Sequence, residues 1–236
     1  MQHLRLFRAL LGSAGLAGCI ALLAGQARAQ ASNFVPQAAP IIVTANGPPL
    51  SPDLFGTVAV PVRIERYAAG WRRAALDASR LPSMLRLVAP ARTLGRDQQV
   101  AYIQAAVTRR IRWISDATEW GQHDYWASAA ETLQHGAGDM EDRAIVKMQA
   151  LRTLGFAPRD LYLTIGRDKV GGQITVLLAR VGRKVYVLDD LGGSPILADR
   201  RQGFEPMLTL GHNVSWIHGR RVAQANRTGV ATGAPR

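Results

Sequence analysis

The chain has 236 residues, of which 47% are hydrophobic and 19% charged, a composition typical of a globular protein that can bury a core. Its net charge is +12, but the arginines are scattered and no RNP, zinc-finger or helix-turn-helix motif accompanies them, which argues against a nucleic-acid-binding protein. The single cysteine, Cys19, excludes an intramolecular disulfide.

Residues 1–29 have the pattern of an export signal. The basic start "MQHLRLFR" precedes the apolar run "ALLGSAGLAGCIALLAG", and "QARA" is an A-x-A cleavage pattern that ends at Ala29. A second interpretation stays open, because "LAGC" ending at Cys19 matches the lipobox of bacterial lipoproteins and would attach the protein to a membrane. Cleavage after Ala29 predicts a secreted, periplasmic protein whose mature form has no thiol.

Two helices are predicted in the first half of the chain. Residues 30–53, rich in Pro, Ala, Ser and Asn, form an expected extended leader, and a first helix is expected from about Tyr67. A second helix is predicted from Asp97 as the N-cap, since apolar residues then recur on one helical face. These residues are Val100, Ile103, Val107, Ile111 and Ile114.

A further helix is predicted to begin at Met140, after the aromatic segment "DATEWGQHDYWASAAETL". Asp139 is expected to cap it by accepting the backbone N–H of Glu141 or Asp142. An acidic first turn suits the positive end of the helix dipole, and Gly155 is a plausible residue after the helix end.

After Gly155 the pattern changes to β-branched runs at residues 161–166, 173–181 and 184–191, which predict strands. Gly182 and Arg183 suit a type II′ hairpin turn between the last two, and "PMLTL" and "VSWIHG" predict two short strands. The tail, residues 220–236, lacks periodicity and is expected to be disordered. Helices followed by an antiparallel sheet make an α+β domain of residues 54–219.

Several motifs of this domain occur in the order found in one family. The block "RWISDATEWGQHDYWASAAETLQHGAGDMEDRAIVKMQALRTLGF", the strand pair "VLLARVGRKVYVLDDL" and the closing "R…F-E-P-M…W" resemble the bacterial transglutaminase-like cysteine peptidases. The resemblance covers roughly residues 54–219. It implies a periplasmic protein of papain-like, transglutaminase-like fold, with N-terminal helices packed on an antiparallel β-sheet.

The departures from the family lie at its Cys-His-Asp triad. The family motif G-D-C-E-D reads G-D-M-E-D at residues 138–142, so Met140 stands at the position of the cysteine. The family histidine opens a strand two residues before a V-L pair, and this position is Ile174. The family acid stands in an L-D-N word, and "LDD" supplies Asp189.

These replacements predict a pseudoenzyme. Methionine cannot form a thiolate and isoleucine cannot transfer a proton, whereas two apolar side chains are the expected filling of a site that has become core. Without a histidine to orient, Asp189 is expected to bond backbone groups or an arginine. We therefore expect a catalytically inactive family member that binds a polypeptide or cell-envelope partner.

Three residues near the triad positions are candidates for binding such a partner. Gln173 is one step from the histidine position, and Asp190 could form a polar pocket floor with Asp189. Trp126, in "DYW", packs beside the site or grips a peptide. His135 is either a loop residue or the one imidazole near the site.

No cofactor is expected, except that the resemblance makes calcium possible. Acidic residues flanking the cysteine position bind calcium in related family members, which makes Asp139 and Glu141 the candidate ligands. Two carboxylates one residue apart would supply only part of a calcium shell, and helix capping by Asp139 is the simpler interpretation.

Two other functions stay open. One is a hydrolase that uses non-thiol groups, for example Asp139, His135 or Asp189, with a bound cation. The other is a structural envelope protein whose basic surface binds polyanions, with an affinity that falls steeply as salt rises.

Overall fold

The computed structural model describes residues 54–169, 172–190 and 193–220. The expected signal peptide and leader, and the tail beyond Arg220, lie outside the described residues, so their boundaries stay predictions. Among the described residues, no helix is long and apolar enough to cross a membrane.

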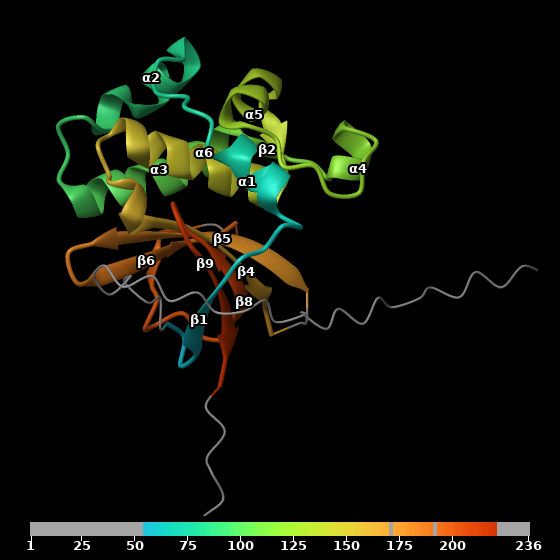
Figure 1. Cartoon of the computed structure of the whole chain (residues 1–236). Helices are drawn as coiled ribbons and strands as arrows, with labels where there is room; N and C mark the ends of the chain where they lie inside the picture. Colours follow the sequence, from blue (N-terminus) through green and yellow to red (C-terminus); the bar gives the residue numbers. More distant parts are fainter. Residues whose placement is uncertain (1–53, 170–171, 191–192, 221–236) are drawn as a thin grey trace, which may run out of the picture. The chain divides into compact units, whose positions relative to one another are not determined.

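A seven-stranded antiparallel sheet is the larger of two sheets, with strand order β1-β9-β8-β4-β5-β6-β7 (Figure 1). Its strands are β1 (Val58–Val62), β4 (Leu161–Arg167), β5 (Gln173–Val181), β6 (Lys184–Leu188), β7 (Ile196–Leu197), β8 (Glu205–Leu210) and β9 (Ser215–Gly219). A separate parallel pair joins β2 (Arg112–Trp113) to β3 (Ala137–Gly138). The predicted antiparallel sheet is thus confirmed, with β1 and β7 as additions.

The hairpin between β5 and β6 follows the prediction. Val181 pairs with Lys184, and Gly182 has a φ of 60°, the left-handed region that glycine adopts without strain. β6 ends earlier than expected, at Leu188, because the carbonyl of Asp189 leaves the ladder and accepts hydrogen bonds from side chains of the helical layer. β1, which contains Pro61, lies at an edge of the sheet, where a missing N–H is tolerated.

The helices gather on one side of the sheet (Figure 1). They are α1 (Ala68–Ala74), α2 (Pro82–Val88), α3 (Arg96–Arg110), α4 (Asp116–Glu119), α5 (Ala129–His135) and α6 (Met140–Thr153), with two short 3-10 helices, η1 (Ala89–Ala91) and η2 (Pro158–Asp160). α6 contacts α2, α3 and α5 as well as β4 and β5, and all residues from 142 to 151 are buried. A helix that is buried all round is the core of its layer.

The start of α3 differs from the prediction. Its N-cap is Gly95, whose N–H donates to the side chain of Gln98 at 3.1 Å. The carboxylate of Asp97 instead accepts hydrogen bonds from Lys184 and Tyr186 of β6, so it ties the helix to the sheet. The chain leaves the helix at Ile111, so four of the five predicted apolar positions are buried and Ile114 is not part of the helical face.

Side-chain alternation along the strands builds one hydrophobic cluster on each face of the sheet. Leu163 and Leu177, which pair across β4 and β5, belong to the cluster that includes the helices. Their neighbours Tyr162 and Leu178 belong to the other cluster, called here the second cluster. Its buried members are Ala59, Tyr162, Ile174, Val176, Leu178, Val187, Ala198, Phe204 and Trp216.

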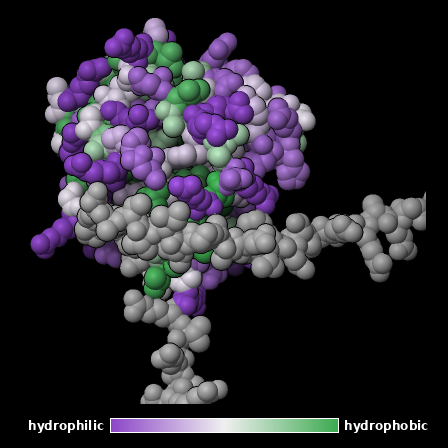
Figure 2. All heavy atoms as spheres, viewed as in Figure 1, coloured by the Kyte–Doolittle hydropathy of each residue, from purple (hydrophilic) through white to green (hydrophobic). Residues whose placement is uncertain are grey.

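The surface is mostly hydrophilic on the face seen in Figure 2, where hydrophobic residues are exposed only in small groups. The large hydrophobic residues that stay exposed in the described part of the chain are Leu76, Leu85, Trp113 and Ile196. They lie in four separate segments of the chain.

Candidate functional site

The first turn of α6 has the geometry that the sequence predicts. The Oδ1 atom of Asp139 accepts the backbone N–H of Glu141 at 3.1 Å and that of Asp142 at 3.4 Å, which caps the helix. A Cβ atom on Gly138 would lie 2.7 Å from the Cβ of Asp142, so only glycine fits there. Met140 is the first helical residue.

The side chains at the cysteine and histidine positions share one apolar environment. Ile174 is a buried member of the second cluster, with 9% of its surface exposed, and Met140 is partly buried and packs against the same cluster. The structure therefore brings Met140 and Ile174, the two residues that the resemblance assigns to the cysteine and histidine positions, to one apolar cluster.

Asp189, at the position of the family acid, forms an ion pair with an arginine. Its Oδ2 lies 3.2 Å from Nε of Arg201, and the two side chains are only 9% and 10% exposed. This is one of the two arrangements expected for Asp189. Arg201 itself was not predicted, although the closing motif "R…F-E-P-M" contains an arginine at this place in the order.

Asp190 belongs to the interior rather than to a pocket floor. Its carboxylate lies 3.1 Å from Nη1 of Arg143 and 2.9 Å from Nζ of Lys147, both on α6. Lys147 also donates to the carbonyl of Asp189 at 3.0 Å. Burial lowers the pKa of Lys147, and the charge of Asp190 opposes this shift. The group joins α6 to the end of β6 and leaves Asp190 with no free oxygen for a partner protein.

Trp126 is also part of the interior. It is 4% exposed, its ring centroid lies 5.7 Å from that of Tyr67, and it packs so closely on Gly70 that a Cβ there would be 2.8 Å from the ring. Packing beside the site is therefore its role, and it presents no surface to a peptide. Of the three candidate binding residues, Gln173 is the exposed one.

His135 lies in a surface group of polar and aromatic side chains. Its ring stacks on Trp120 at 4.7 Å, and Nδ1 lies 3.0 Å from a carboxylate oxygen of Glu119. These contacts hold the loop after α4 against α5. The group of possible metal ligands at the start of α6 consists of three aspartates and does not include His135.

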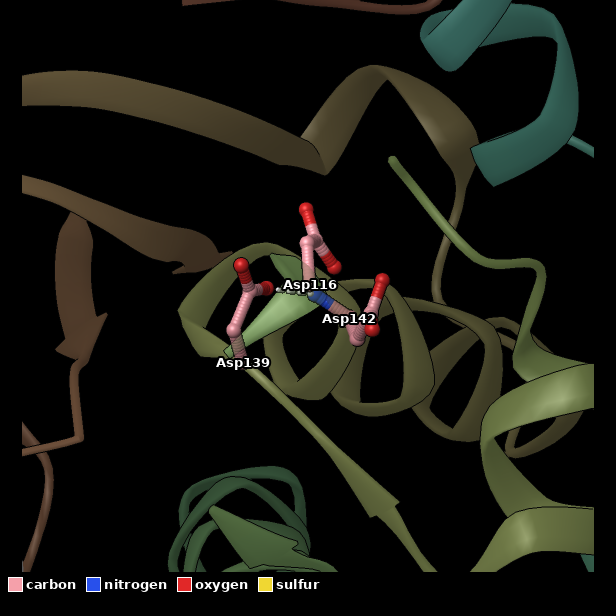
Figure 3. A group of neighbouring side chains, drawn as sticks. All are labelled: Asp116, Asp139 and Asp142. Carbon is pink, nitrogen blue, oxygen red and sulfur yellow. Dashed lines mark hydrogen bonds between the residues drawn. The ribbon is translucent and has the colours of Figure 1, made fainter. Parts of the chain in front are cut away.

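Three aspartates gather at the start of α6 (Figure 3). Asp116, Asp139 and Asp142 each offer a carboxylate oxygen, and these oxygens lie within 4.8 Å of one another. Asp116 uses Oδ2 to accept the N–H of Tyr125 at 2.6 Å, and Asp142 uses Oδ1 to accept that of Ala127 at 2.7 Å. The other oxygen of each is buried and has no hydrogen-bond partner in the described part of the chain.

The carboxylates of this group are buried and lie close enough to raise one another's pKa. Burial raises the pKa of Asp139 to about 9, and the neighbouring carboxylates of Glu141, Asp142 and Asp116 add to the shift. Burial likewise raises the pKa of Asp142 to about 7 and raises that of Asp116. Crowded, buried carboxylates of this kind must either take up protons or share a cation.

Glu141, which is predicted as a metal ligand, forms a hydrogen bond with the sheet and lies outside the group of three aspartates. Its Oε1 accepts a hydrogen bond of 2.8 Å from the hydroxyl of Thr175 on β5, and burial raises its pKa. Of the two predicted ligands, Asp139 belongs to the group of three oxygens and Glu141 does not. The sequence showed Asp142 only as an acid of the first turn, and nothing marked Asp116.

Comparison with known proteins agrees with the geometry. A family model described as bacterial transglutaminase-like cysteine proteinase matches residues 85–200. The chain belongs to this family. None of the curated proteins compared with the chain matches it significantly. The family membership confirms the resemblance seen in the sequence, and the α+β, transglutaminase-like fold is confirmed with it.

Solved structures of Legionella pneumophila LapG have a similar fold. One is 21% identical, with a TM-score of 0.51 over 57% of this chain and 74% of LapG. A calcium-bound LapG is 21% identical, with a TM-score of 0.51 over 57% of this chain and 76% of LapG. An EGTA-treated LapG is 20% identical, with a TM-score of 0.51 over 67% of this chain and 87% of LapG. At these identities, the likeness to LapG concerns the fold alone.

Proposed function

We propose that this protein is an exported member of the transglutaminase-like cysteine proteinase family that lacks thiol-peptidase activity, binds calcium and recognises a polypeptide. The observation that carries the loss of activity is the absence of a cysteine from residues 54–220, where Met140 is the first residue of α6. Acyl transfer by this kind of enzyme begins with thiolate attack, and a thioether has no ionisable proton.

The other two triad positions support the same conclusion. Ile174 offers no base to take a proton from a nucleophile, and its side chain lies in an apolar cluster. The carboxylate of Asp189 is neutralised by Arg201. A triad acts by orienting an imidazole between the acid and the nucleophile, and here the acid is bound to another group.

Calcium is the cation that suits the three aspartates. Ca²⁺ prefers six to eight oxygen ligands, with carboxylates among them. The buried oxygens of Asp116 and Asp142 without partners, together with Asp139, would supply part of that shell. LapG, which has a similar fold, is described in a calcium-bound and an EGTA-treated form. The ion would neutralise the carboxylates and join α4 to the start of α6.

Export rests on the first 29 residues, with cleavage after Ala29 and a periplasmic location. Lipidation at Cys19 is the alternative, and it would attach the same domain to a membrane. Mass spectrometry of the protein purified from the cell envelope separates the two, since the cleavage sites differ and only one product carries lipid.

Peptidase activity is tested with the protein purified from the periplasm. Labelled casein and a mixed peptide library are incubated with it in millimolar calcium, before and after treatment with iodoacetamide. We expect no cleavage in either case. Cleavage that resists iodoacetamide but stops with EGTA would instead support a hydrolase that uses carboxylates and a cation.

Polypeptide recognition is tested by photo-crosslinking. A photoreactive amino acid at Gln173, the exposed residue beside the histidine position, is expected to crosslink a polypeptide in periplasmic extract. The matched control carries the same group at Arg183, which is exposed in the turn between β5 and β6. Equal crosslinking at both positions, or at neither, would contradict recognition at this site.

A further inference from the structure

A large cavity lies beside the triad positions. Its volume is ≈ 810 Å³, and it is lined by residues from three segments, 54–56, 167–169 and 198–205, together with Arg220. This is within the range of ligand-binding cavities, which usually hold an apolar surface and a few polar groups. The three segments are the start of the described chain, the end of β4 and the loop before β8.

The floor of the cavity is aromatic and continues into the second cluster. The rings of Phe55 and Phe204 meet edge to face, with centroids 4.9 Å apart. Phe204 lies directly against Gly166, where a Cβ would be 2.5 Å from its ring. Gly166 pairs with Ile174 across β4 and β5. An apolar side chain bound on this floor would therefore lie next to the cluster that contains Ile174 and contacts Met140.

Two basic side chains, Arg167 and Lys169, stand on the rim of the cavity. Arg167 and Lys169 are exposed, and neither has an ion pair within the described residues. The side-chain stem of Lys169 lies over Gly203, where any Cβ would clash with it. This contact keeps the Lys169 side chain at the cavity.

The remaining charges at the cavity are mostly engaged. Arg201 pairs with Asp189, and Arg220 lies 3.4 Å from Glu205. Asp168 accepts the N–H of Gly172 within its own turn. Asp168 keeps its negative charge in this hydrogen bond, and Asp199 is a second, exposed acid, so the charges of the lining nearly balance. The cations available to a ligand are therefore local, at Arg167 and Lys169.

We propose that this cavity binds a polypeptide segment in which an apolar side chain stands beside acidic side chains. The apolar side chain would pack on Phe55 and Phe204, and the carboxylates would pair with Arg167 and Lys169. The net charge of +12 favours the approach of such a segment. A continuous polyanion fits less well, because the aromatic floor offers it nothing and Asp199 repels it. The proposal rests on the polypeptide recognition proposed above.

The test measures peptide binding by fluorescence anisotropy in millimolar calcium. The probe is an end-capped heptapeptide with a central leucine flanked by glutamates, and its matched partners replace either the glutamates by glutamine or the leucine by serine. We expect the first peptide to bind about tenfold more tightly than either partner. The double variant Arg167→Ala with Lys169→Ala should lose this preference for glutamate and leave the binding of the glutamine peptide unchanged.

A matched variant controls for net charge. Arg109→Ala with Arg110→Ala removes the same charge at the exposed end of α3, outside the cavity lining, and should weaken binding less than about twofold. Phe55→Ala tests the floor, because Phe55 is only partly buried and its loss spares the core. It should weaken binding of the leucine peptide and not of the serine peptide.

Three results would overturn the cavity assignment. The first is that the α3 control weakens peptide binding as much as the Arg167 and Lys169 variant does. The second is that the Arg167 and Lys169 variant binds the glutamate peptide as tightly as the unchanged protein. The third is that a leucine-free polyglutamate binds more tightly than the leucine peptide. If crosslinking at Gln173 still occurs, recognition of a polypeptide stands and only the cavity is wrong. Cleavage of the peptides would instead contradict the proposed loss of activity, whatever their affinity.

Discussion

Arg201 and Asp189 form a nearly buried ion pair, with Nε of the arginine 3.2 Å from Oδ2 of the carboxylate. The arginine comes from the loop before β8, and the aspartate follows β6. In a triad, this carboxylate would hold an imidazole. Here the guanidinium of Arg201 lies against it, and the ion pair links the loop to the end of β6.

Removing the arginine alone should be costly. Arg201→Leu leaves the Asp189 carboxylate without its cation in a buried place, and we expect the free energy of unfolding to fall by about 3 kcal/mol. Arg201→Leu with Asp189→Asn should cost less than the single change, because no charge is left behind. Urea denaturation measures both. Arg220→Leu, which removes a pair that is mostly exposed, is the control and should have almost no effect.

Rebuilding two triad positions should restore thiol reactivity. In the variant Met140→Cys with Ile174→His, the new thiol is at the first residue of α6, where the helix dipole and a nearby imidazole favour the thiolate. We expect it to react with iodoacetamide near neutral pH at least about tenfold faster than Met140→Cys alone. A well-folded double variant that reacts no faster would show that residue 174 does not face residue 140.

The sequence predicted the elements of the fold well where the signal is local. The capped start of α6, the glycine turn after β5 and the strand runs of β4 to β6 all depend on residues close together in the chain. It did not predict β1, because five residues containing Pro61 become a strand only through pairing with β9, more than 150 residues later in the chain. Asp97 is not the cap of α3, because its carboxylate accepts hydrogen bonds from Lys184 and Tyr186 of β6, which the local sequence does not show.

The candidate site, like the fold, could be predicted only where the signal lies in residues close together in the chain. The predicted losses at Met140 and Ile174 rest on the order of the motifs alone, and the structure adds that both side chains meet the same apolar cluster. The burial of Trp126 and Asp190 could not, because it depends on which partners, Gly70 and Lys147 among them, tertiary packing brings close. Asp116 could not be joined to the metal group from the sequence, since 23 residues separate it from Asp139 and only the fold closes that distance.

Calcium should stabilise the protein through the three aspartates. We expect the melting temperature to rise by several degrees in calcium above its value in EGTA, since a ligand that binds only the folded state stabilises it. Asp116→Asn with Asp142→Asn should abolish the rise, measured by calorimetry and by isothermal titration of calcium. Glu65→Gln, at an exposed acid outside the group, is the matched control and should keep it. A calcium effect that survives the double change would place the ion elsewhere.

Without calcium, the same carboxylates should make stability fall as pH rises. The folded-state pKa is about 7 for Asp142 and about 9 for Asp139, and both are raised from 3.8. Between 3.8 and its raised pKa, each carboxyl holds a proton in the folded protein that it has lost in the unfolded chain. The free energy of unfolding therefore decreases with pH, and the stability that is present at about pH 4 is lost progressively up to about pH 9.

The pH dependence and the calcium effect should oppose each other. Calcium needs the ionised carboxylates, so its affinity rises over the range in which the metal-free protein weakens. Melting temperatures from about pH 5 to about pH 8 should fall in EGTA and change little in saturating calcium. In Asp142→Asn, one of the shifted groups is gone, and the fall in EGTA should be smaller. A flat profile in EGTA would mean that the three carboxylates are already ionised in the folded protein and that the positive charge they require is supplied by the protein itself.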